Sequence, residues 1–448
     1  MKNYILATLA ASLLYSPLIL AKEIYFEGNS SLPIVHLNAV FKNGSITDPK
    51  GKFGITNFTA EMLIRGTHRR TKEQIALALD QMGGKIEIET RAEAVIFRGA
   101  VLASSLNSFL GLFEEILTEP VFSENEIRKL KSEIVSAILE EKGQDASLNS
   151  RRFARHLFGD HPYGKPILGR TQDIQSINES QIRAHYDRTI RDESMVVIGS
   201  GDSNLEVITA WASRISNARH VSAPLADTDI SQPETVQHRR LLIVDKPDRT
   251  QTQILIGQVG LQMDDPKFFP LHIANFAFGG TPFSSRLKVE IRVKRGWSYG
   301  AGSAFRFGKK PRLWTANLFP ASKYAPDALA YTLKMIEELK RDGITKEELE
   351  FSKQSLIKGA GFMYNTPAKR VENAIIEKTL GLPDGLMKSY ADRMESVTWE
   401  ETNQAIKEYI RPNELTISVL ATAKVLKEAL SKASGEGTEV IVSPYTED

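Results

Sequence analysis

An internal repeat constrains the fold of this chain more than any other feature of its sequence. Residues 114–117 (Glu-Glu-Ile-Leu) lead to 123–126 (Ser-Glu-Asn-Glu), and residues 337–340 (Glu-Glu-Leu-Lys) lead to 345–348 (Thr-Lys-Glu-Glu), at an offset of 222 to 223 residues. Both second members have the Ser/Thr-x-x-Glu pattern of a capping box, which predicts a helix start at each. A repeat of this length indicates a duplicated domain rather than one large core.

Each copy combines alternating strand patterns with amphipathic helices. In the first copy the sequence predicts strands over 31–42, 86–89 and 94–102, and helices over 57–65, from the capping box at 71–74, over 106–117 and after Ser123. In the second copy it predicts strands over 240–245, 253–260 and 313–319, and helices over 268–278, 325–340 and after Thr345. We therefore expect an α+β protein with domains at 22–220 and 236–448, joined by a linker at 221–235 that is rich in Ser, Pro, Asp and Thr.

Composition excludes several functional classes. The hydrophobic share of 42% and the charged share of 25% are typical of a globular protein and not of a disordered one. A net charge of +2 over 448 residues gives no support to nucleic acid as a main partner, which would require a strongly basic face. The chain has no cysteine, so disulfides and thiolate metal sites are excluded.

The N-terminus predicts export. Lys2 provides a positive charge, residues 4–20 are mostly apolar, and Ala21 precedes a charged pair, which is the pattern of a secretory signal peptide over residues 1–21. The alternative is an uncleaved membrane anchor, but the segment is short and is interrupted by Ser12, Ser16 and Pro17. We expect a periplasmic protein that has no membrane contact after cleavage.

The densest local signal lies at residues 279–300. Gly279 and Gly280 predict a turn or a close backbone approach, Ser284 or Ser285 is a candidate helix cap, and Gly296 is placed to end the helix. The helical spacing of Leu287, Ile291 and Lys294 sets Arg292 near the helix end, and Tyr299 begins the next strand pattern. The short turn at Gly296 therefore predicts that the side chains of Arg292 and Tyr299 meet.

These features resemble the M16 family of zinc peptidases, which includes pitrilysin and the mitochondrial processing peptidases. The resemblance runs from about residue 31 to about residue 421. It is carried by the Gly279-Gly280 loop with the helix after it, by Arg292 and Tyr299 seven residues apart, and by residues 161–164 (His-Pro-Tyr-Gly) with 168–171 (Leu-Gly-Arg-Thr). It implies two M16-type domains that form half of a closed chamber. It also implies that Arg292 and Tyr299 hydrogen-bond the carbonyl oxygen of a substrate peptide bond.

The zinc motif of the family is degenerate in this sequence. Catalytic members carry His-x-x-Glu-His followed by a glutamate roughly 75 residues on, in which the histidines hold zinc and the motif's glutamate activates water. The matching positions here are Asn57, Ala60 and Glu61, and the downstream glutamate falls near Ala137 or Ile138. Glu133, Glu140 and Glu141 lie nearby in the sequence. Because carboxylates without histidine are a poor zinc set, we expect no metal site in this chain.

The resemblance implies a non-catalytic, substrate-binding subunit. Some bacterial members divide the site between two chains, so we expect a heterodimer in which a partner with His-x-x-Glu-His holds the zinc and Arg292 and Tyr299 act in trans on a peptide. One alternative is a homodimeric peptide-binding or scaffold protein. In that case an extended peptide would add to the edge of the hairpin at 85–102, beside Ile86, Ile88 and Thr90. Another alternative is an active peptidase with an unconventional metal site that includes Glu61.

Three smaller features have simpler interpretations. His161 is interpreted as a packing and turn residue. The basic cluster of Arg65, His68, Arg69, Arg70 and Lys72 is interpreted as a solvated surface, with an anion site as the alternative. Residues 431–448 are expected to be mobile, with a short strand over 440–442.

Overall fold

The computed structural model describes residues 23–190, 195–218, 230–281 and 283–447, which form two halves. The elements of the N-terminal half are β1 (Ile24–Gly28), β2 (Ile34–Phe41), η1 (Ser45–Thr47), α1 (Ile55–Leu63), α2 (Lys72–Gln81), β3 (Lys85–Thr90), β4 (Val95–Leu102), η2 (Ala103–Ser105), α3 (Leu106–Thr118), α4 (Glu124–Gly143), α5 (Asp145–Phe158), η3 (Pro162–Gly164), α6 (Thr171–Ser176), α7 (Glu179–Thr189), β5 (Met195–Gly201) and α8 (Leu205–Ala218). Those of the C-terminal half are β6 (Arg240–Asp245), β7 (Gln253–Val259), α9 (Phe268–Asn275), η5 (Phe276–Gly280), η6 (Lys288–Lys294), β8 (Ser298–Arg306), β9 (Leu313–Pro320), η7 (Ser322–Tyr324), α10 (Ala325–Asp342), α11 (Lys346–Tyr364), α12 (Pro367–Leu380), α13 (Tyr390–Ser396), α14 (Trp399–Tyr409), η8 (Pro412–Glu414), β10 (Thr416–Ala421), α15 (Ala423–Ala433) and β11 (Glu439–Pro444).

The two sheets share one topology, which confirms the predicted α+β fold with two related domains. The N-terminal sheet has the order β1-β5-β2-β4-β3 and the C-terminal sheet the order β11-β6-β10-β7-β9-β8, so the second repeats the first with β11 added at one edge. In both, a parallel pair (β1 with β5, β6 with β10) is followed by three antiparallel pairs, and β11 adds a second parallel pair to the C-terminal sheet. The helices α4 and α11 begin at residues 124 and 346, and α5 and α12 at 145 and 367, which is the predicted offset.

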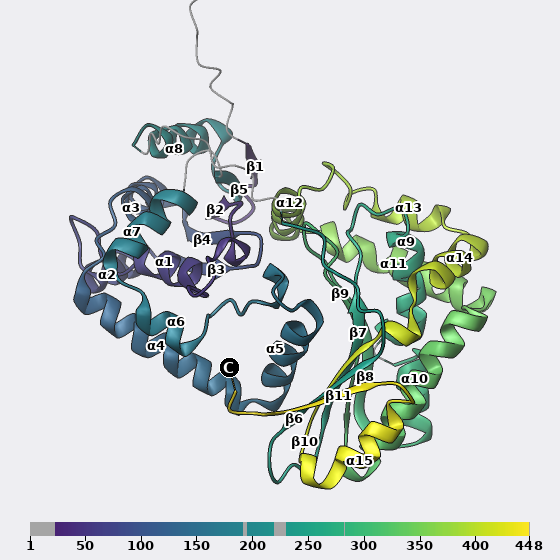
Figure 1. Cartoon of the computed structure of the whole chain (residues 1–448). Helices are drawn as coiled ribbons and strands as arrows, with labels where there is room; N and C mark the ends of the chain where they lie inside the picture. The colour runs from purple at the N-terminus through teal and green to yellow at the C-terminus, as the bar shows by residue number, and fades with distance from the viewer. Residues whose placement is uncertain (1–22, 191–194, 219–229, 282, 448) are drawn as a thin grey trace, which may run out of the picture.

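The halves exchange one helix each (Figure 1). In the N-terminal sheet, Val35, Leu37 and Ala39 of β2 face a core formed by the helices of the same half. The opposite face packs against α12 of the C-terminal half, where Val371 and Ile375 contact side chains of β2, β4 and β5. Alternate strand residues point to opposite faces of a sheet, and here both faces are buried.

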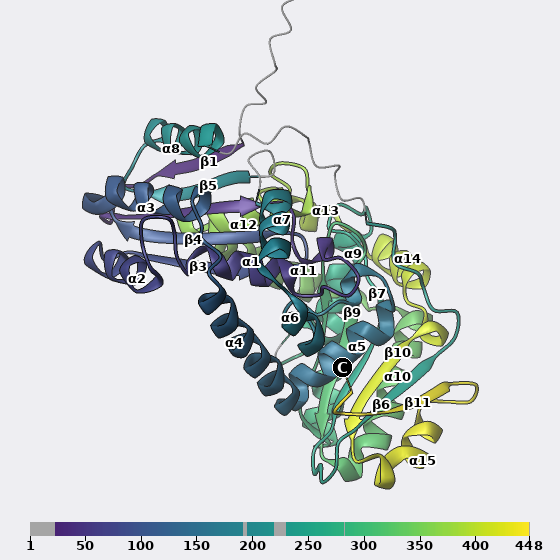
Figure 2. The ribbon, with the colours of Figure 1, turned by 60° about the vertical axis from the view of Figure 1, so that its left-hand side comes forward.

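The equivalent helix of the N-terminal half, α5, packs on the C-terminal sheet. Leu148 contacts β6 and β10 side chains, and Phe153 and Leu157 pack with Leu313 and the β7 side chain Leu255. Figure 2 shows α4 running from the N-terminal half down to α5, which lies beside the C-terminal strands. The long helix pair α4–α5 therefore crosses from one half to the other.

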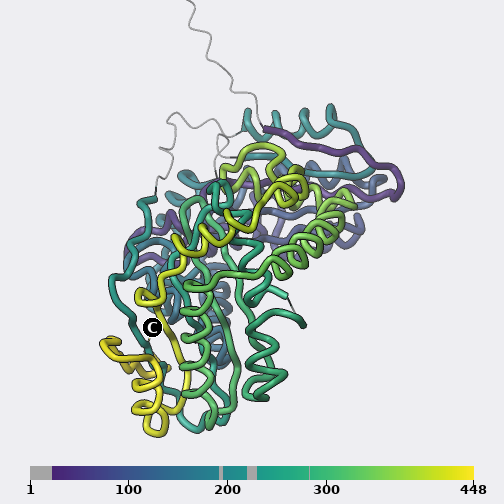
Figure 3. Tube along the Cα trace, turned by 90° about the vertical axis from the view of Figure 1, so that its right-hand side faces the viewer, coloured from purple at the N-terminus to yellow at the C-terminus, as the bar shows by residue number. Residues whose placement is uncertain are grey.

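The C-terminal segment is ordered, so the expected mobility of residues 431–448 is wrong for 431–447. The predicted strand over 440–442 is confirmed as part of β11, which pairs in parallel with β6. Arg152 of α5 donates to Ser443 Oγ at 2.6 Å and to the Pro444 carbonyl at 2.7 Å. Figure 3 shows this segment in yellow at the end of the molecule opposite the purple strand β1. The local sequence did not predict this order, because Arg152, which anchors the segment, lies in α5, 291 residues before Ser443.

Two predicted segments lie wholly or partly outside the described residues. The predicted signal peptide, residues 1–21, is among them, as are 221–229 of the predicted linker. Within the described part of the linker, Ile230 is buried with Phe153 and Tyr163, so residues 230–235 are not a free tether. Among the described residues, no helix has both the length and the apolar content needed to cross a membrane.

Candidate functional site

The degenerate zinc motif lies on α1, which begins after Gly54 and ends at Leu63, two residues before the predicted end. Asn57 and Ala60 are buried, Ala60 completely, and Glu61 is half-buried. Burial raises the pKa of Glu61, and the nearby Arg65 opposes this shift. An amide, a methyl group and one carboxyl do not form a zinc donor set.

An arginine links the two helices that carry the motif positions. Arg65, which follows α1, forms a two-bond ion pair with Glu133 of α4; one of these bonds joins Nη1 to Oε1 at 3.1 Å. Its Nη1 also lies 3.5 Å from Glu126 Oε2. Ile138 is fully buried in the core. In the part of the chain that the structure describes, no three His, Cys, Asp or Glu side chains lie close enough to hold a metal.

The start of α1 is held by a buried network that the sequence did not reveal. The carboxylate of Asp48 accepts hydrogen bonds from the backbone amides of Gly54 and Thr56 and from the Thr56 hydroxyl. His185 Nε2 of α7 lies 2.8 Å from the same hydroxyl. Burial raises the pKa of Asp48 to about 6 and lowers that of His185 to about 3. All three side chains are buried, so this network positions α1 and is closed to a substrate.

Arg292 and Tyr299 meet, as the sequence predicted. The Arg292 guanidinium lies over the Tyr299 ring, 5.1 Å from its centre. Tyr299 is the second residue of the edge strand β8 and is 83% exposed, and Arg292 is also exposed. Neither side chain forms a hydrogen bond or ion pair with any other described residue. Two donor groups are therefore presented to solvent side by side.

Glu290, the acid nearest to Arg292 in the sequence, is hydrogen-bonded to other side chains. Glu290 accepts hydrogen bonds from Lys294 at 2.6 Å, from Arg295 at 2.5 Å and from Tyr331 at 3.1 Å. The bonds from Lys294 and Arg295 hold the pKa of Glu290 at about 2. Because Glu290 is satisfied by three other donors, the Arg292 guanidinium stays available to a ligand.

The helix that carries Arg292 is wider than the sequence predicted. Residues Lys288–Lys294 form a π-helix, and so do Phe276–Gly280 before the loop, where a continuous α-helix over 268–278 was expected. Ser285 directly precedes the first helical residue, Arg286, at the predicted cap position, but its Oγ donates to the Thr281 carbonyl and does not cap the helix. The predicted stop at Gly296 is confirmed by its φ of 65°. π-helical turns are rare and occur frequently at functional sites.

The glycines of the loop approach the strand next to it. A Cβ on Gly279 would lie 2.4 Å from Ser303 Oγ and 2.5 Å from its backbone nitrogen, so only glycine fits against β8. A Cβ on Gly280 would lie 3.2 Å from the side chain of Asn275. Asn275 Oδ1 accepts from Ser303 Oγ at 2.6 Å and from Trp314 Nε1 at 2.8 Å. A buried hydrogen-bond network therefore fixes the base of the loop.

The other predicted substrate residues lie in the N-terminal half. Ile86, Ile88 and Thr90 are on β3, the edge strand of the N-terminal sheet, as expected. Ile86 is buried, and the other two are half-buried. β3 and β8 occupy equivalent edges of the two sheets, so the predicted residues belong to two sites and not to one continuous surface.

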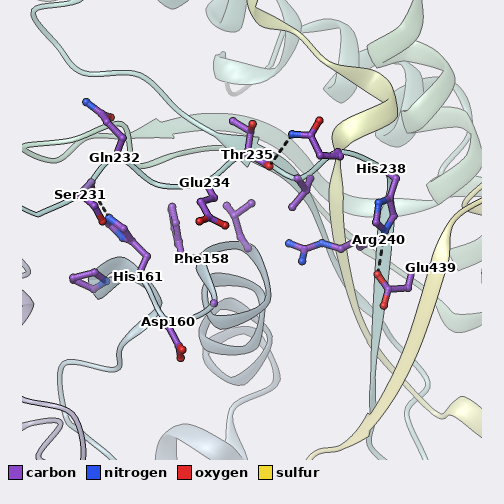
Figure 4. A pocket seen from close by; sticks show the side chains of 15 residues that line it. Phe158, Asp160, His161, Ser231, Gln232, Glu234, Thr235, His238, Arg240 and Glu439 are labelled. Atoms are coloured by element: carbon purple, nitrogen blue, oxygen red, sulfur yellow. Dashed lines mark hydrogen bonds and ion pairs between the residues drawn. The ribbon is translucent and has the colours of Figure 1, made fainter.

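The His161 segment is structural. His161 Nδ1 accepts from the Tyr163 amide at 3.1 Å, and Nε2 lies 2.9 Å from the Ser231 carbonyl oxygen. This segment borders a cavity of about 800 Å³, where His238 Nε2 lies 3.2 Å from Glu439 Oε2 (Figure 4). None of the predicted catalytic or substrate-binding residues lines this cavity.

The basic cluster is largely neutralised, which favours the solvated-surface interpretation. Arg69 forms two bonds with Glu119, Arg70 pairs with Glu115, and Arg65 pairs as described above. The cluster borders a cavity of about 450 Å³ that Glu126 also lines. A carboxylate in the wall disfavours an anion.

Comparisons with known proteins identify the family. Residues 24–171 match the family model described as Insulinase (Peptidase family M16), and residues 176–356 match the one described as Peptidase M16 inactive domain. The chain is 22% identical to the Helicobacter pylori protein named "Non-peptidase homolog YmxG", over 90% of this chain and 92% of that protein. It is 24% identical to the Bacillus subtilis protein named "Uncharacterized zinc protease YmxG", over 80% of this chain and 86% of that protein.

Solved structures show the same fold. A crystal structure of a peptidase M16 inactive domain from Pseudomonas fluorescens superimposes with a TM-score of 0.82 at 23% identity, over 89% of this chain and 96% of that one. A chain of the complex III dimer from Candida albicans gives a TM-score of 0.74 at 12% identity, over 92% of this chain and 97% of that one. The matches to both halves show that this chain belongs to the M16 peptidase family.

Proposed function

We propose that this protein is the non-catalytic, substrate-binding subunit of a hetero-oligomeric M16 zinc peptidase of the periplasm. Its partner would carry an intact His-x-x-Glu-His motif and the zinc. The exposed Arg292–Tyr299 pair would complete the partner's active site in trans. The observation that carries the proposal is this pair, because two unengaged donors at a sheet edge have no structural task in this chain.

The chemistry of the pair suits peptide hydrolysis. The guanidinium is a permanent cation with several N–H donors, and the phenol is a neutral O–H donor. Both can donate to a carbonyl oxygen as negative charge develops on it during attack by water. The π-helix and the close-packed glycine at position 279 hold the two donors in fixed relation to β8.

The N-terminal half supports a role without zinc of its own. Ala60 replaces the residue that would activate water, and Arg65 engages Glu133, one of the acids near the expected downstream position. The name of the Helicobacter pylori relative is consistent with a chain that is not itself a peptidase.

Reconstitution tests the proposal. The full chain, combined with an M16 chain that bears His-x-x-Glu-His and is purified from the same source, should hydrolyse a quenched fluorescent peptide faster than either chain alone. Arg292→Ala should lower kcat by about 100-fold, since one oxyanion donor is lost. Tyr299→Phe should lower it to a similar degree, and Val425→Ala, at an exposed position in α15, serves as the matched control. Full activity of the partner alone would refute the proposal.

A second candidate is a homodimeric peptide-binding or scaffold protein. The observation that favours it is the edge position of β3, whose outer side has no neighbouring strand within the sheet. An extended peptide can add to such an edge through main-chain hydrogen bonds. Sedimentation analysis of the purified chain, alone and with the partner, discriminates the two: a stable homodimer that ignores the partner favours the scaffold.

A further inference from the structure

A cavity between the two halves holds an acidic side chain with an unmet hydrogen-bonding group. The cavity is about 490 Å³ and lies where β3 ends, with walls from the β3–β4 turn, from α12 and from the segments that flank β8 and β9. It exists only because the halves pack together, since Glu93 comes from one half and Phe307 and Leu380 from the other. Most of its lining residues are half-buried, so solvent reaches it.

Glu93 is the unusual group in this wall. The residue is 4% exposed, and its Oε1 has no hydrogen-bond partner among the described residues. Its carboxylate interacts with the Tyr163 hydroxyl, which donates to the Lys310 carbonyl at 3.3 Å and accepts from the Lys310 amide at 3.0 Å. Buried carboxylates are normally paired or hydrogen-bonded, so an unpartnered oxygen in a cavity wall requires an explanation.

The cations around the cavity do not neutralise Glu93. Arg91 pairs with Glu89 and with Glu372 of α12. Arg312 lies over the Tyr163 ring, 5.3 Å from its centre, and forms no ion pair with Glu93 in the described structure. The Thr90 hydroxyl, at the end of β3, is also buried without a partner. Two oxygen atoms in this wall, Glu93 Oε1 and Thr90 Oγ1, therefore have no hydrogen-bond partner among the described residues.

The rest of the lining is largely apolar. Ile167, Met263, Phe307, Ile376 and Leu380 contribute side chains from both halves. Apolar walls with one buried carboxylate fit a flexible hydrocarbon stem that ends in a cation, because the stem is desolvated while the cation forms charge-assisted hydrogen bonds.

We propose that this cavity binds the cationic end, an ammonium or guanidinium group, of an extended peptide that pairs with β3. A strand added along β3 passes Thr90 and reaches the cavity, so one residue of the peptide is placed to enter it. The cavity then selects substrates by a basic residue or a free amino terminus. This inference rests on the peptide binding proposed above, but it requires neither the partner nor hydrolysis.

Direct binding to the purified full chain tests the site. The probes are heptapeptides of alternating valine and threonine, amidated and labelled at the C-terminus, with lysine, arginine, norleucine or glutamate at the centre. With acetylated amino termini, the lysine or arginine peptide should bind about tenfold more tightly than the norleucine peptide, the size expected for one hydrogen bond to a charged group. A norleucine peptide with a free amino terminus forms the second arm. Tight binding in that arm alone identifies the amino terminus as the cation.

Two variants assign the preference to Glu93. Glu93→Gln keeps the shape of the side chain and should reduce the tenfold preference to about one. Gly308→Ala keeps the charge but should also abolish it, because a Cβ there would lie 2.2 Å from the Tyr163 hydroxyl and 2.6 Å from Glu93 Oε1. Glu206→Gln, at an exposed position in α8, is the control and should retain the preference.

Two outcomes overturn the inference: equal binding of all peptides to the native chain, or a preference for the cationic peptides that survives in Glu93→Gln. If the preference is absent while the reconstituted peptidase still depends on Arg292, then this cavity fails and the proposed function stands.

Discussion

The two halves share a topology but differ in how they use their charged side chains. In the N-terminal half, α1 and α4 are joined by the buried Arg65, which contacts Glu133 and Glu126. In the C-terminal half, a π-helix and the edge strand β8 leave Arg292 and Tyr299 exposed and unengaged. Arg65 is thus paired within its own half, whereas Arg292 and Tyr299 are exposed and pair only with each other among the described side chains. Two copies of one fold can thus differ in which charged side chains they pair and which they expose.

The strongest way to break this comparison is to weaken the helix exchange that holds the halves together. Phe153→Ala in α5 removes a nearly fully buried aromatic side chain and should cost about 3–5 kcal/mol of unfolding free energy. Ile375→Ala in α12 should cost about 2–5 kcal/mol for the same reason. Denaturant unfolding measures both, with Val425→Ala as the exposed control, within about 0.5 kcal/mol of the native chain. A loss confined to one half, seen by hydrogen exchange, would show that the halves fold independently.

Acid should destabilise the surroundings of α9 in the C-terminal half more than those of α1 in the N-terminal half. Packing between Phe268 and Tyr390 buries His272 in the C-terminal half and lowers its pKa to about 4. Its folded pKa lies below the unfolded value of about 6.5, so the unfolded state takes up the proton first and stability falls as the pH drops from 6.5 towards 4. The expected loss at pH 5 is about 1–2 kcal/mol.

The N-terminal half contains an opposing pair. Burial lowers the pKa of His185 to about 3, so the contribution of His185 to the free energy of unfolding also falls as the pH drops from 6.5. Asp48 acts in the opposite direction. Its folded pKa of about 6 lies above the unfolded value, so the cost of burying its charge is relieved as the pH falls from 6 to 4 and the protein becomes more stable. Hydrogen exchange at pH 7 and pH 5 should therefore show a larger loss of protection around α9, which carries His272, than around α1, which the Asp48 network positions. His272→Leu should remove that difference, and an unchanged difference would contradict the assignment.

The smallest expected effect concerns the arginine link. Arg65→Met and Glu133→Gln should each cost about 1 kcal/mol, because Glu133 is half exposed and water partly replaces the lost bond. A double-mutant cycle by thermal unfolding should give a coupling of about 0.5–1 kcal/mol. No coupling would mean that α1 and α4 are held by packing alone.

The sequence predicted the parts of the site that depend on local rules. Gly296 has the positive φ that ends the helix, and the turn there brings Arg292 to Tyr299 as expected. The capping box at Thr71 is confirmed, because both of its bonds join residues three apart. At Ser123 only half of the second box forms, since the Glu126 side chain binds Lys129 and Arg65 instead. The cap pattern failed where two cations, Lys129 three residues away and Arg65 far away in the sequence, competed for the Glu126 carboxylate.

The sequence alone determined three features: the repeat, the pattern of strands and helices, and the degenerate zinc motif. Each depends on periodicity or on residue identity. Tertiary structure decided that α5 and α12 cover each other's sheets, that β11 is held by Arg152, and that Glu93 and Phe307 share one cavity. Each of these contacts joins segments far apart in the chain. A periodic pattern shows that a face is apolar, but only packing selects which of the available apolar faces covers it.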